Sequence, residues 1–299
     1  MDITEVDPFG EDELDTIDSF SRWRIENPDS LEDVLAFLDR AAGDDAENTV
    51  HHRFLVTLDA LDQCVYTSMH AAEDEALRLD DVEVEDTPES LHAFDRAQLA
   101  HIVSRFTDPA FRVEAPSLIG RLPAEDADIE VLARLNTDPD DALDAVLMVQ
   151  ALPLEHVGDP DDDAADDPSG HSADLFAGLP NGYFSDDLDV FENHALVRHL
   201  AGEYGYRLFG IGASLLGLVR PEPLGPEAAA HLTGDLARLY GGAEAPAWSD
   251  FTAAVSSGRV LLVGYTSGFA EGFGPSSAGG DGAADERDAS ADAAADPGR

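Results

Sequence analysis

Hydrophobic positions at steps of three and four residues predict helices along the first half of the chain. Ser30 is a suitable N-cap, and the acidic residues and apolar stripe that follow it predict a helix from Leu31. Thr87 followed by Pro88 predicts the start of another helix, which continues through Phe106. The longest stripe predicts one central helix of about seven turns. It consists of Val50, Phe54, Leu58, Leu61, Val65, Met69 and Ala72.

The pattern is less regular elsewhere in this half. Residues 1–28 are acidic and mixed, and we expect an acidic N-terminal arm without well-defined structure. Between Phe111 and Leu135, short apolar runs suit strands and irregular structure equally. Asp138-Pro139-Asp140 predicts the start of another helix, whose apolar residues include Leu143, Val146, Leu147 and Val149. Residues 29–156 are therefore predicted to form a mainly helical domain.

The second half contains a shorter structured block between two polar segments. Residues 157–174 have no apolar period and many aspartates, which predicts an acidic linker. Residues 274–299 contain no apolar residue larger than alanine, which predicts a disordered tail. The block between them, 175–273, is predicted to be a separate α+β domain.

Local signals mark the elements of this block. Asp187 or Asp189 is suited to cap a helix that Gly205 ends. Apolar runs on either side of Gly212 predict a β-hairpin, or one strand with a bulge. Helices are expected from Pro226 and near residues 250–255, followed by a strand over 260–263. The expected fold class is α+β: a mainly helical N-terminal block with a long central helix, followed by a small α+β C-terminal block.

The charge of the chain changes the interpretation of its surroundings. Its 17 basic residues are all arginine, and 63 Asp and Glu give a formal net charge of −46. This charge opposes compaction in dilute buffer, whereas ~1 M salt reduces the Debye length to ~3 Å. A GC-rich genome would explain the missing lysine but not the excess of carboxylates. We therefore expect adaptation to concentrated salt. Intrinsic disorder suits only the linker and tail, because 43% of the residues are hydrophobic.

Several classes of protein are excluded or disfavoured. The arginines are scattered, so neither direct nucleic-acid binding nor binding to an anionic membrane is expected. The acidic N-terminus and the absence of 18 consecutive apolar residues favour a cytoplasmic location. Cys64 is the single cysteine, which excludes an intrachain disulfide, and its apolar surroundings predict a buried thiol.

Motifs for cofactors and metals are incomplete. No two histidines show the i, i+4 spacing of a helical zinc pair, and the acidic linker lacks the glycine and glutamate of a calcium loop. Gly210-Ile211-Gly212 lacks the remainder of a dinucleotide fingerprint. Without lysine, the usual P-loop and Schiff-base chemistry is excluded. We expect neither a cofactor nor a metal.

One polar group near the first helix of the second block remains as candidate chemistry. It comprises Tyr183, Glu192, His194, Arg198 and Tyr204. His194 and Arg198 are four residues apart and share one helix face, beside the Asn181-Gly182 loop. The candidate catalytic residues are Glu192, His194 and Arg198. We favour an ordinary solvated face over a site for this group, because charged runs are usually solvated faces.

The composition resembles that of uncharacterised acidic cytoplasmic proteins of halophilic archaea. The stretch from Gly182 to Pro223 resembles a small α+β domain of unknown function, and this resemblance implies no activity. Because the catalytic motifs are incomplete, we expect a non-catalytic protein-binding or regulatory module with a protein partner. The alternatives are an enzyme with a small polar site near His194 and Arg198, or a subunit of a larger complex. The sequence decides neither whether the protein is an enzyme nor its oligomeric state.

Overall fold

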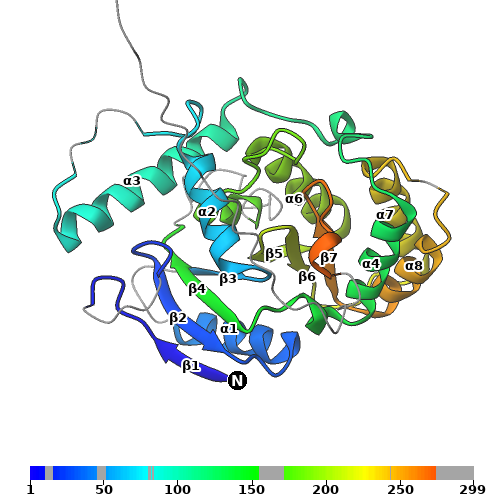
Figure 1. The fold of residues 1–299 in the computed structure, drawn as a ribbon, viewed down its shortest axis with the longest axis horizontal. Coiled ribbons are helices and arrows are strands. Elements are labelled where there is room, and N and C mark those ends of the chain that lie inside the picture. Colours follow the sequence, from blue (N-terminus) through cyan, green and yellow to red (C-terminus); the bar gives the residue numbers. More distant parts are fainter. Residues whose placement is uncertain are drawn as a thin grey trace, which may run out of the picture.

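One mixed seven-stranded sheet runs through the described part of the chain (Figure 1). In spatial order it contains β1 (Asp2–Glu5), β2 (Ser21–Glu26), β4 (Val146–Leu152), β3 (Arg53–Thr57), β5 (Arg207–Ile211), β6 (Leu215–Val219) and β7 (Val260–Gly264). Neighbouring strands are antiparallel except β3 and β5, which are parallel. The computed structural model describes residues 1–10, 16–45, 52–79, 82, 84–154, 172–242 and 244–273.

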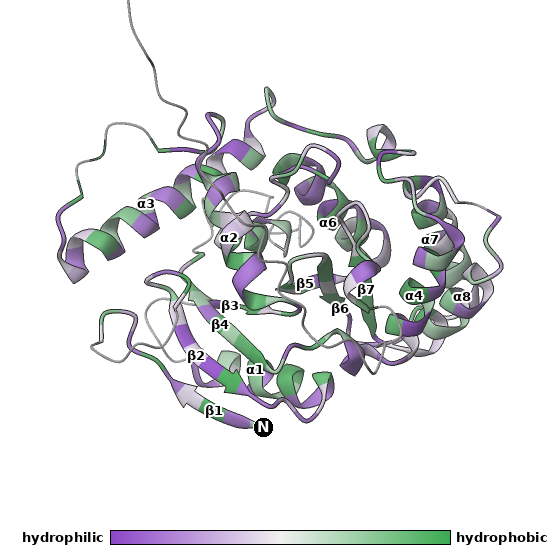
Figure 2. Ribbon diagram, in the orientation of Figure 1, coloured by the Kyte–Doolittle hydropathy of each residue, from purple (hydrophilic) through white to green (hydrophobic). Residues whose placement is uncertain are grey.

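Helices pack on the central strands (Figure 1). They are α1 (Leu31–Asp45), α2 (Leu61–Ala72), α3 (Pro88–Thr107), α4 (Asp126–Thr137), α6 (Val190–Tyr204), α7 (Pro226–Leu239) and α8 (Trp248–Ser257). Of these, α4, α7 and α8 lie beyond β7. Strands β5, β6 and β7 are buried on both faces, as expected for strands covered on both sides. Figure 2 shows the resulting concentration of hydrophobic residues in the centre of the sheet. No described helix is long and apolar enough to cross a membrane.

The α+β class predicted from the sequence is confirmed. Several elements follow their local signals closely. Thr87 Oγ1 caps α3 by accepting a hydrogen bond from the Ser90 N–H, and Pro88 is the first residue of that helix. Gly205 ends α6 in the left-handed conformation with φ of 70°. The expected hairpin forms from β5 and β6.

The predicted long central helix is confirmed over residues 61–72, where α2 forms, and is wrong over residues 53–57. Residues 53–57 form the buried strand β3, and α2 begins only at Leu61. Ala60 separates the two elements with a left-handed backbone, at φ of 43°. The helix prediction failed because apolar residues four apart occur in a run of mostly apolar residues as well as in a helix. Such a run suits a strand buried on both faces. Val50 lies outside the described residues.

Other parts of the first half also differ from the prediction. The run at 129–132 lies in α4, whose start is fixed by a capping box between Glu125 and Asp128. The helix expected over 143–149 is instead β4, a run of β-branched and apolar residues paired on both edges. The expected arm contributes β1 and β2 to the sheet. Helices α1 to α4 still make up most of the regular structure described within residues 29–156, but this block also contributes β3 and β4 to the sheet.

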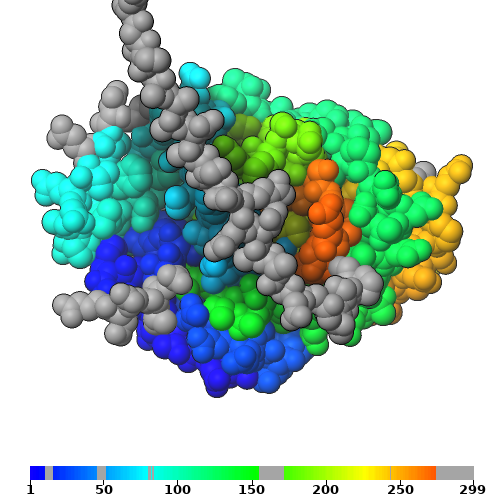
Figure 3. All heavy atoms as spheres, in the orientation of Figure 1, coloured from blue at the N-terminus to red at the C-terminus, as the bar shows by residue number. Residues whose placement is uncertain are grey.

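Both predicted domains contribute strands to the same sheet. Val56 of β3 is in register with Gly210 of β5, so the pairing joins segments about 150 residues apart. One cluster of buried apolar residues includes members of both blocks. Figure 3 shows the beginning, middle and end of the described chain packed against one another. The division into two domains stays a prediction; residues 157–171 of the predicted linker and the whole tail (274–299) lie outside the described residues.

Candidate functional site

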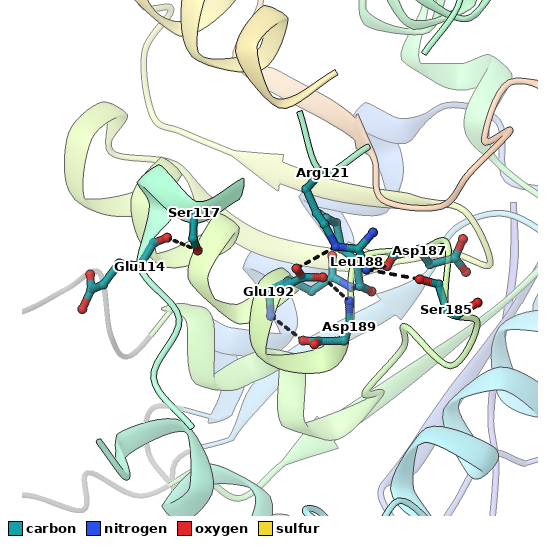
Figure 4. A network of polar contacts seen from close by, with 9 residues as sticks. Glu114, Ser117, Arg121, Ser185, Asp187, Leu188, Asp189 and Glu192 are labelled. Atoms are coloured by element: carbon teal, nitrogen blue, oxygen red, sulfur yellow. Dashed lines mark hydrogen bonds and ion pairs between the residues drawn. The ribbon is translucent and has the colours of Figure 1, made fainter. Parts of the chain in front are cut away.

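Glu192 fixes the start of α6 (Figure 4). Its Oε2 accepts a 2.9 Å hydrogen bond from the Asp189 N–H, and Asp189 Oδ1 accepts one of 2.8 Å from the Glu192 N–H. The other carboxylate oxygen, Oε1, accepts a 2.8 Å hydrogen bond from Arg121 Nε. Both oxygens of this predicted catalytic carboxylate are therefore engaged in a helix cap and an ion pair.

Arg121 extends this network to the loop before α6. Its Nη2 donates to the carbonyl oxygen of Asp187 at 2.6 Å and to that of Ser185 at 3.3 Å. The same guanidinium thus holds the helix start and the loop over residues 182–188. The loop reaches the sheet as well, because the Leu188 N–H donates to the Tyr265 carbonyl at 3.0 Å.

His194 lies in the interior, against α3. Its side chain is 8% exposed, and its ring stacks on Phe106 with 4.1 Å between the centroids. Nε2 is 3.5 Å from Asp174 Oδ1. Burial lowers the pKa of His194, and the nearby Asp174 opposes that shift. The neutral, stacked ring is thus chiefly a packing residue.

Arg198 anchors the segment that leads to the turn Ala115–Leu118. Its Nη2 donates to the Val113 carbonyl oxygen at 2.8 Å and lies 3.5 Å from Glu114 Oε2. Glu192, His194 and Arg198 therefore have separate partners, although all three lie on α6. None of the three lines either of the two pockets described in this subsection.

Tyr183, also singled out from the sequence, belongs to a row of exposed aromatic side chains. Its ring centroid is 5.1 Å from that of His70 and 5.2 Å from that of Phe184. The His70 ring in turn lies 4.4 Å from Tyr66. Met69 lies on the same side of α2, three residues after Tyr66. We call these five residues the aromatic surface: Tyr66, Met69, His70, Tyr183 and Phe184.

The aromatic surface is exposed to a degree unusual for such side chains. Tyr66, Met69, Tyr183 and Phe184 are each 49–58% exposed. Isolated apolar side chains on a surface need no explanation, but a contiguous group is typical of a binding site. Interfaces are also enriched in tyrosine, phenylalanine and methionine.

A pocket of about 390 Å³ opens beside the aromatic surface. Tyr183, His70 and Phe191 contribute rings to its wall. The carboxylates of Glu73, Asp74 and Asp189 also line it. Of the residues lining this pocket, only His70 can carry a positive charge, and it lies 3.5 Å from Glu73. The pocket thus combines aromatic faces with an excess of negative charge.

A second polar cluster joins α6 to α7. His199 and Tyr204 of α6 both hydrogen-bond Asp235 of α7, beside a pocket of about 230 Å³. The sequence identified Tyr204 as part of one polar group with Tyr183, whereas the structure places the two in different clusters. No sequence signal links His199 to Asp235, because the pair forms only when the two helices pack.

Metal and thiol chemistry receive no support from the described residues. Within the described ranges, no three His, Cys, Asp or Glu residues form a group that could hold a metal ion. Cys64 is buried as predicted, and its Sγ lies 3.6 Å from the Ile211 carbonyl oxygen. Burial raises the pKa of this thiol far above its ordinary value, which makes it a poor nucleophile.

Comparison with protein-family models, with curated proteins and with solved structures gives no match.

Proposed function

We propose that this protein is a binding module that docks an arginine-bearing, apolar segment of a partner protein on its aromatic surface. The main observation behind this proposal is the continuous row of ring contacts from Tyr66 through His70 and Tyr183 to Phe184. Large, half-exposed aromatic side chains supply contact area at low cost in conformational entropy, and they frequently dominate binding energy.

The charge of the neighbouring pocket supports an arginine in the partner. A guanidinium stacks on aromatic faces and forms paired hydrogen bonds with carboxylates. Tyr183 offers such a face, and Glu73, whose side chain is 71% exposed, offers an accessible carboxylate at the same pocket. A segment with an apolar residue beside an arginine would therefore occupy both the rings and the pocket.

The rigid setting of the loop also supports docking. Tyr183 and Phe184 lie in the segment that Arg121 holds through the carbonyls of Ser185 and Asp187. A loop that is already ordered loses less conformational entropy when it binds. The non-catalytic role expected from the sequence is consistent with this arrangement, since Glu192, His194 and Arg198 have separate partners.

We also propose that the module works in a salt-rich cytoplasm. The support is compositional: 63 carboxylates against 17 arginines on a 299-residue chain. Concentrated salt would screen long-range attraction between this surface and a basic partner, leaving contacts at short range as the main source of affinity. Aromatic stacking and apolar burial are such contacts.

Site-specific photo-crosslinking tests the docking surface. A benzophenone amino acid would replace Tyr183 in one variant and Leu91, a 37% exposed residue of α3, in a matched control. In the source cells, the variant at position 183 should form one dominant adduct that the variant at position 91 does not form. The crosslinked peptide of the partner should contain an arginine close to the attachment point.

A synthetic copy of that peptide then tests the chemistry with purified protein in molar KCl. Tyr183→Ser and Glu73→Gln should each weaken binding by about tenfold, the effect of about 1.4 kcal/mol, whereas Leu91→Ser should not. Citrulline in place of the arginine should weaken binding similarly. Equal affinity of the arginine and citrulline peptides would show that the partner's arginine is not recognised. Identical adducts at positions 183 and 91 would refute the docking surface.

A further inference from the structure

The last third of α6 carries a polar cluster that the docking surface does not use. Asp235 Oδ2 accepts a 2.8 Å hydrogen bond from His199 Nε2 and a 2.5 Å hydrogen bond from the Tyr204 hydroxyl. The other carboxylate oxygen, Oδ1, accepts from Arg238 Nη2. Three donors from two helices thus converge on one carboxylate.

These contacts define the state of Asp235. Partial burial acts to raise its pKa, but the hydrogen bonds from Tyr204 and His199, followed by the charges of a protonated His199 and of Arg238, outweigh burial and lower it. Asp235 is therefore ionised, and its negative charge is already satisfied by its neighbours. A ligand would not need to neutralise it.

The contacts also determine what His199 and Arg238 can offer. Because His199 Nε2 donates to Asp235, the Nδ1 atom of the neutral ring is left with a lone pair, and it becomes a donor when the ring is protonated. Arg238 uses only Nη2 toward Asp235, and a guanidinium has five N–H donors. Its side chain is 58% exposed, so the remaining donors are accessible.

An apolar pocket of about 230 Å³ adjoins this cluster. It lies between the turn Ala115–Leu118, α6 and α7, and four leucines of the two helices form much of its wall: Leu196, Leu200, Leu236 and Leu239. His199, Asp235 and Arg238 are its polar lining residues. Pockets for drug-sized ligands measure ~300–1,000 Å³, so this one suits a molecule of about one ring.

We propose that this pocket binds a small apolar carboxylic acid as its anion. The ring or short chain would lie between the leucines, and the carboxylate would accept hydrogen bonds from the accessible N–H groups of Arg238 and, when the ring is protonated, from His199 Nδ1. Arginine is well suited to recognise a carboxylate, and an arginine beside an apolar pocket suits a ligand with one polar end.

Charge balance gives the proposal a second observable. When the His199 imidazole is neutral, the charges of Arg238 and Asp235 cancel. A bound carboxylate then leaves one net negative charge in the cluster. Protonation of His199 would neutralise that remaining negative charge. Binding of the anion should therefore be accompanied by uptake of a proton. The charged or titratable groups beside the imidazole are Tyr204 and the i+4 residue Glu203 on its own helix, and Asp235 and Arg238 on α7; the turn Ala115–Leu118 contains none.

Benzoate and benzamide form a matched pair of probes, because they share one ring and differ in charge. In molar KCl, titration followed by NMR should show saturable binding of benzoate, at least about tenfold weaker binding of benzamide, and tighter benzoate binding as the pH falls from about 8.5 to about 5.5. His199→Gln should abolish this pH dependence, and Arg238→Gln should weaken benzoate binding by about tenfold.

His231→Gln is the matched control, since His231 is an exposed histidine of α7 that does not line the pocket. It should leave both the affinity and its pH dependence unchanged. Circular dichroism of each variant would verify the fold, and Arg238→Gln changes a largely exposed side chain, so it keeps the test available if His199→Gln unfolds. Equal affinity for benzamide, absence of saturable benzoate binding, or an unchanged pH profile in folded His199→Gln protein would overturn the proposal.

Discussion

Replacing Arg121 by methionine should destabilise the protein and loosen the loop that presents Tyr183 and Phe184. Arg121 Nε donates to Glu192 at 2.8 Å, and Nη2 donates to the Asp187 carbonyl at 2.6 Å. The side chains of Arg121 and Glu192 are only 31% and 15% exposed. Methionine preserves much of the apolar stem, so the substitution removes chiefly the charged hydrogen bonds.

The expected magnitude follows from these two bonds. A hydrogen bond to a charged group contributes ~1.5–3 kcal/mol, and partial exposure reduces that value. The two strong bonds of Arg121 together should therefore contribute about 2–3 kcal/mol to the free energy of unfolding. The third bond, to Ser185 at 3.3 Å, is long and adds little.

Arg112→Met is the matched control. Arg112 Nε also binds a glutamate, Glu114 at 2.6 Å, but those two side chains are 54% and 62% exposed. An exposed ion pair contributes ~0–1 kcal/mol, so this control should lose less than about 1 kcal/mol. If bond length alone determined the contribution, Arg112→Met would lose more stability than Arg121→Met.

Denaturant unfolding in constant molar KCl measures both free energies, and hydrogen exchange reports the loop directly. The Asp187 N–H, bonded to the Phe184 carbonyl at 3.1 Å, and the Leu188 N–H should exchange faster in Arg121→Met but not in Arg112→Met. Equal losses of stability in the two variants, or unchanged exchange over residues 182–188, would show that Arg121 does not hold the loop.

Three further predictions test the interior and the solvent. Burial raises the pKa of Asp18 to about 7, against hydrogen bonds from Phe20, Gln150 and Ser21. The folded protein binds the Asp18 proton more tightly than the unfolded chain, whose carboxyl pKa is about 4. The free energy of unfolding should therefore fall as the pH rises from about 4 through about 7. Asp18→Asn should reduce that slope in urea titrations. The Cys64 thiol should not react with a thiol reagent in the native protein and should react fully in denaturant; rapid native labelling would contradict its burial. Transfer from molar KCl to dilute buffer should reduce the helical circular dichroism signal, because the net charge of −46 is then unscreened, and an unchanged spectrum and melting temperature would mean that the charge is no adaptation of the fold to salt.

Sequence signals located the elements whose ends are determined locally. The capping residues Thr87 and Asp189 and the terminal Gly205 act within four residues of themselves, so a single stretch of chain contains all the information. The interpretation failed where one pattern suits two structures. The apolar run at 54–58 has spacings compatible with a helix, and its burial as β3 depends on pairing with β4 and β5, which lie far along the chain.

The sites were less predictable than the fold because each is assembled from distant segments. Tyr66 and Tyr183 are 117 positions apart in the chain and meet through His70. His199 and Asp235 are 36 positions apart and meet only when α6 packs on α7. The residues selected from one helix, Glu192, His194 and Arg198, shared a sequence neighbourhood but point to different partners. Proximity along a helix therefore grouped residues of α6 that the structure places against different neighbours.

Several arginines of this chain connect segments that lie far apart in the sequence. Arg121 binds Glu192, Arg198 binds the Val113 carbonyl, and Arg259 binds Glu32 at 2.7 Å. A planar guanidinium with several donors can join a carboxylate and a backbone carbonyl at once, which a compact ammonium does less well. The two proposed ligands differ because the charges at the two pockets differ. An arginine of the partner complements the carboxylates around Glu73, whereas a carboxylate complements Arg238, which remains exposed although it pairs with Asp235.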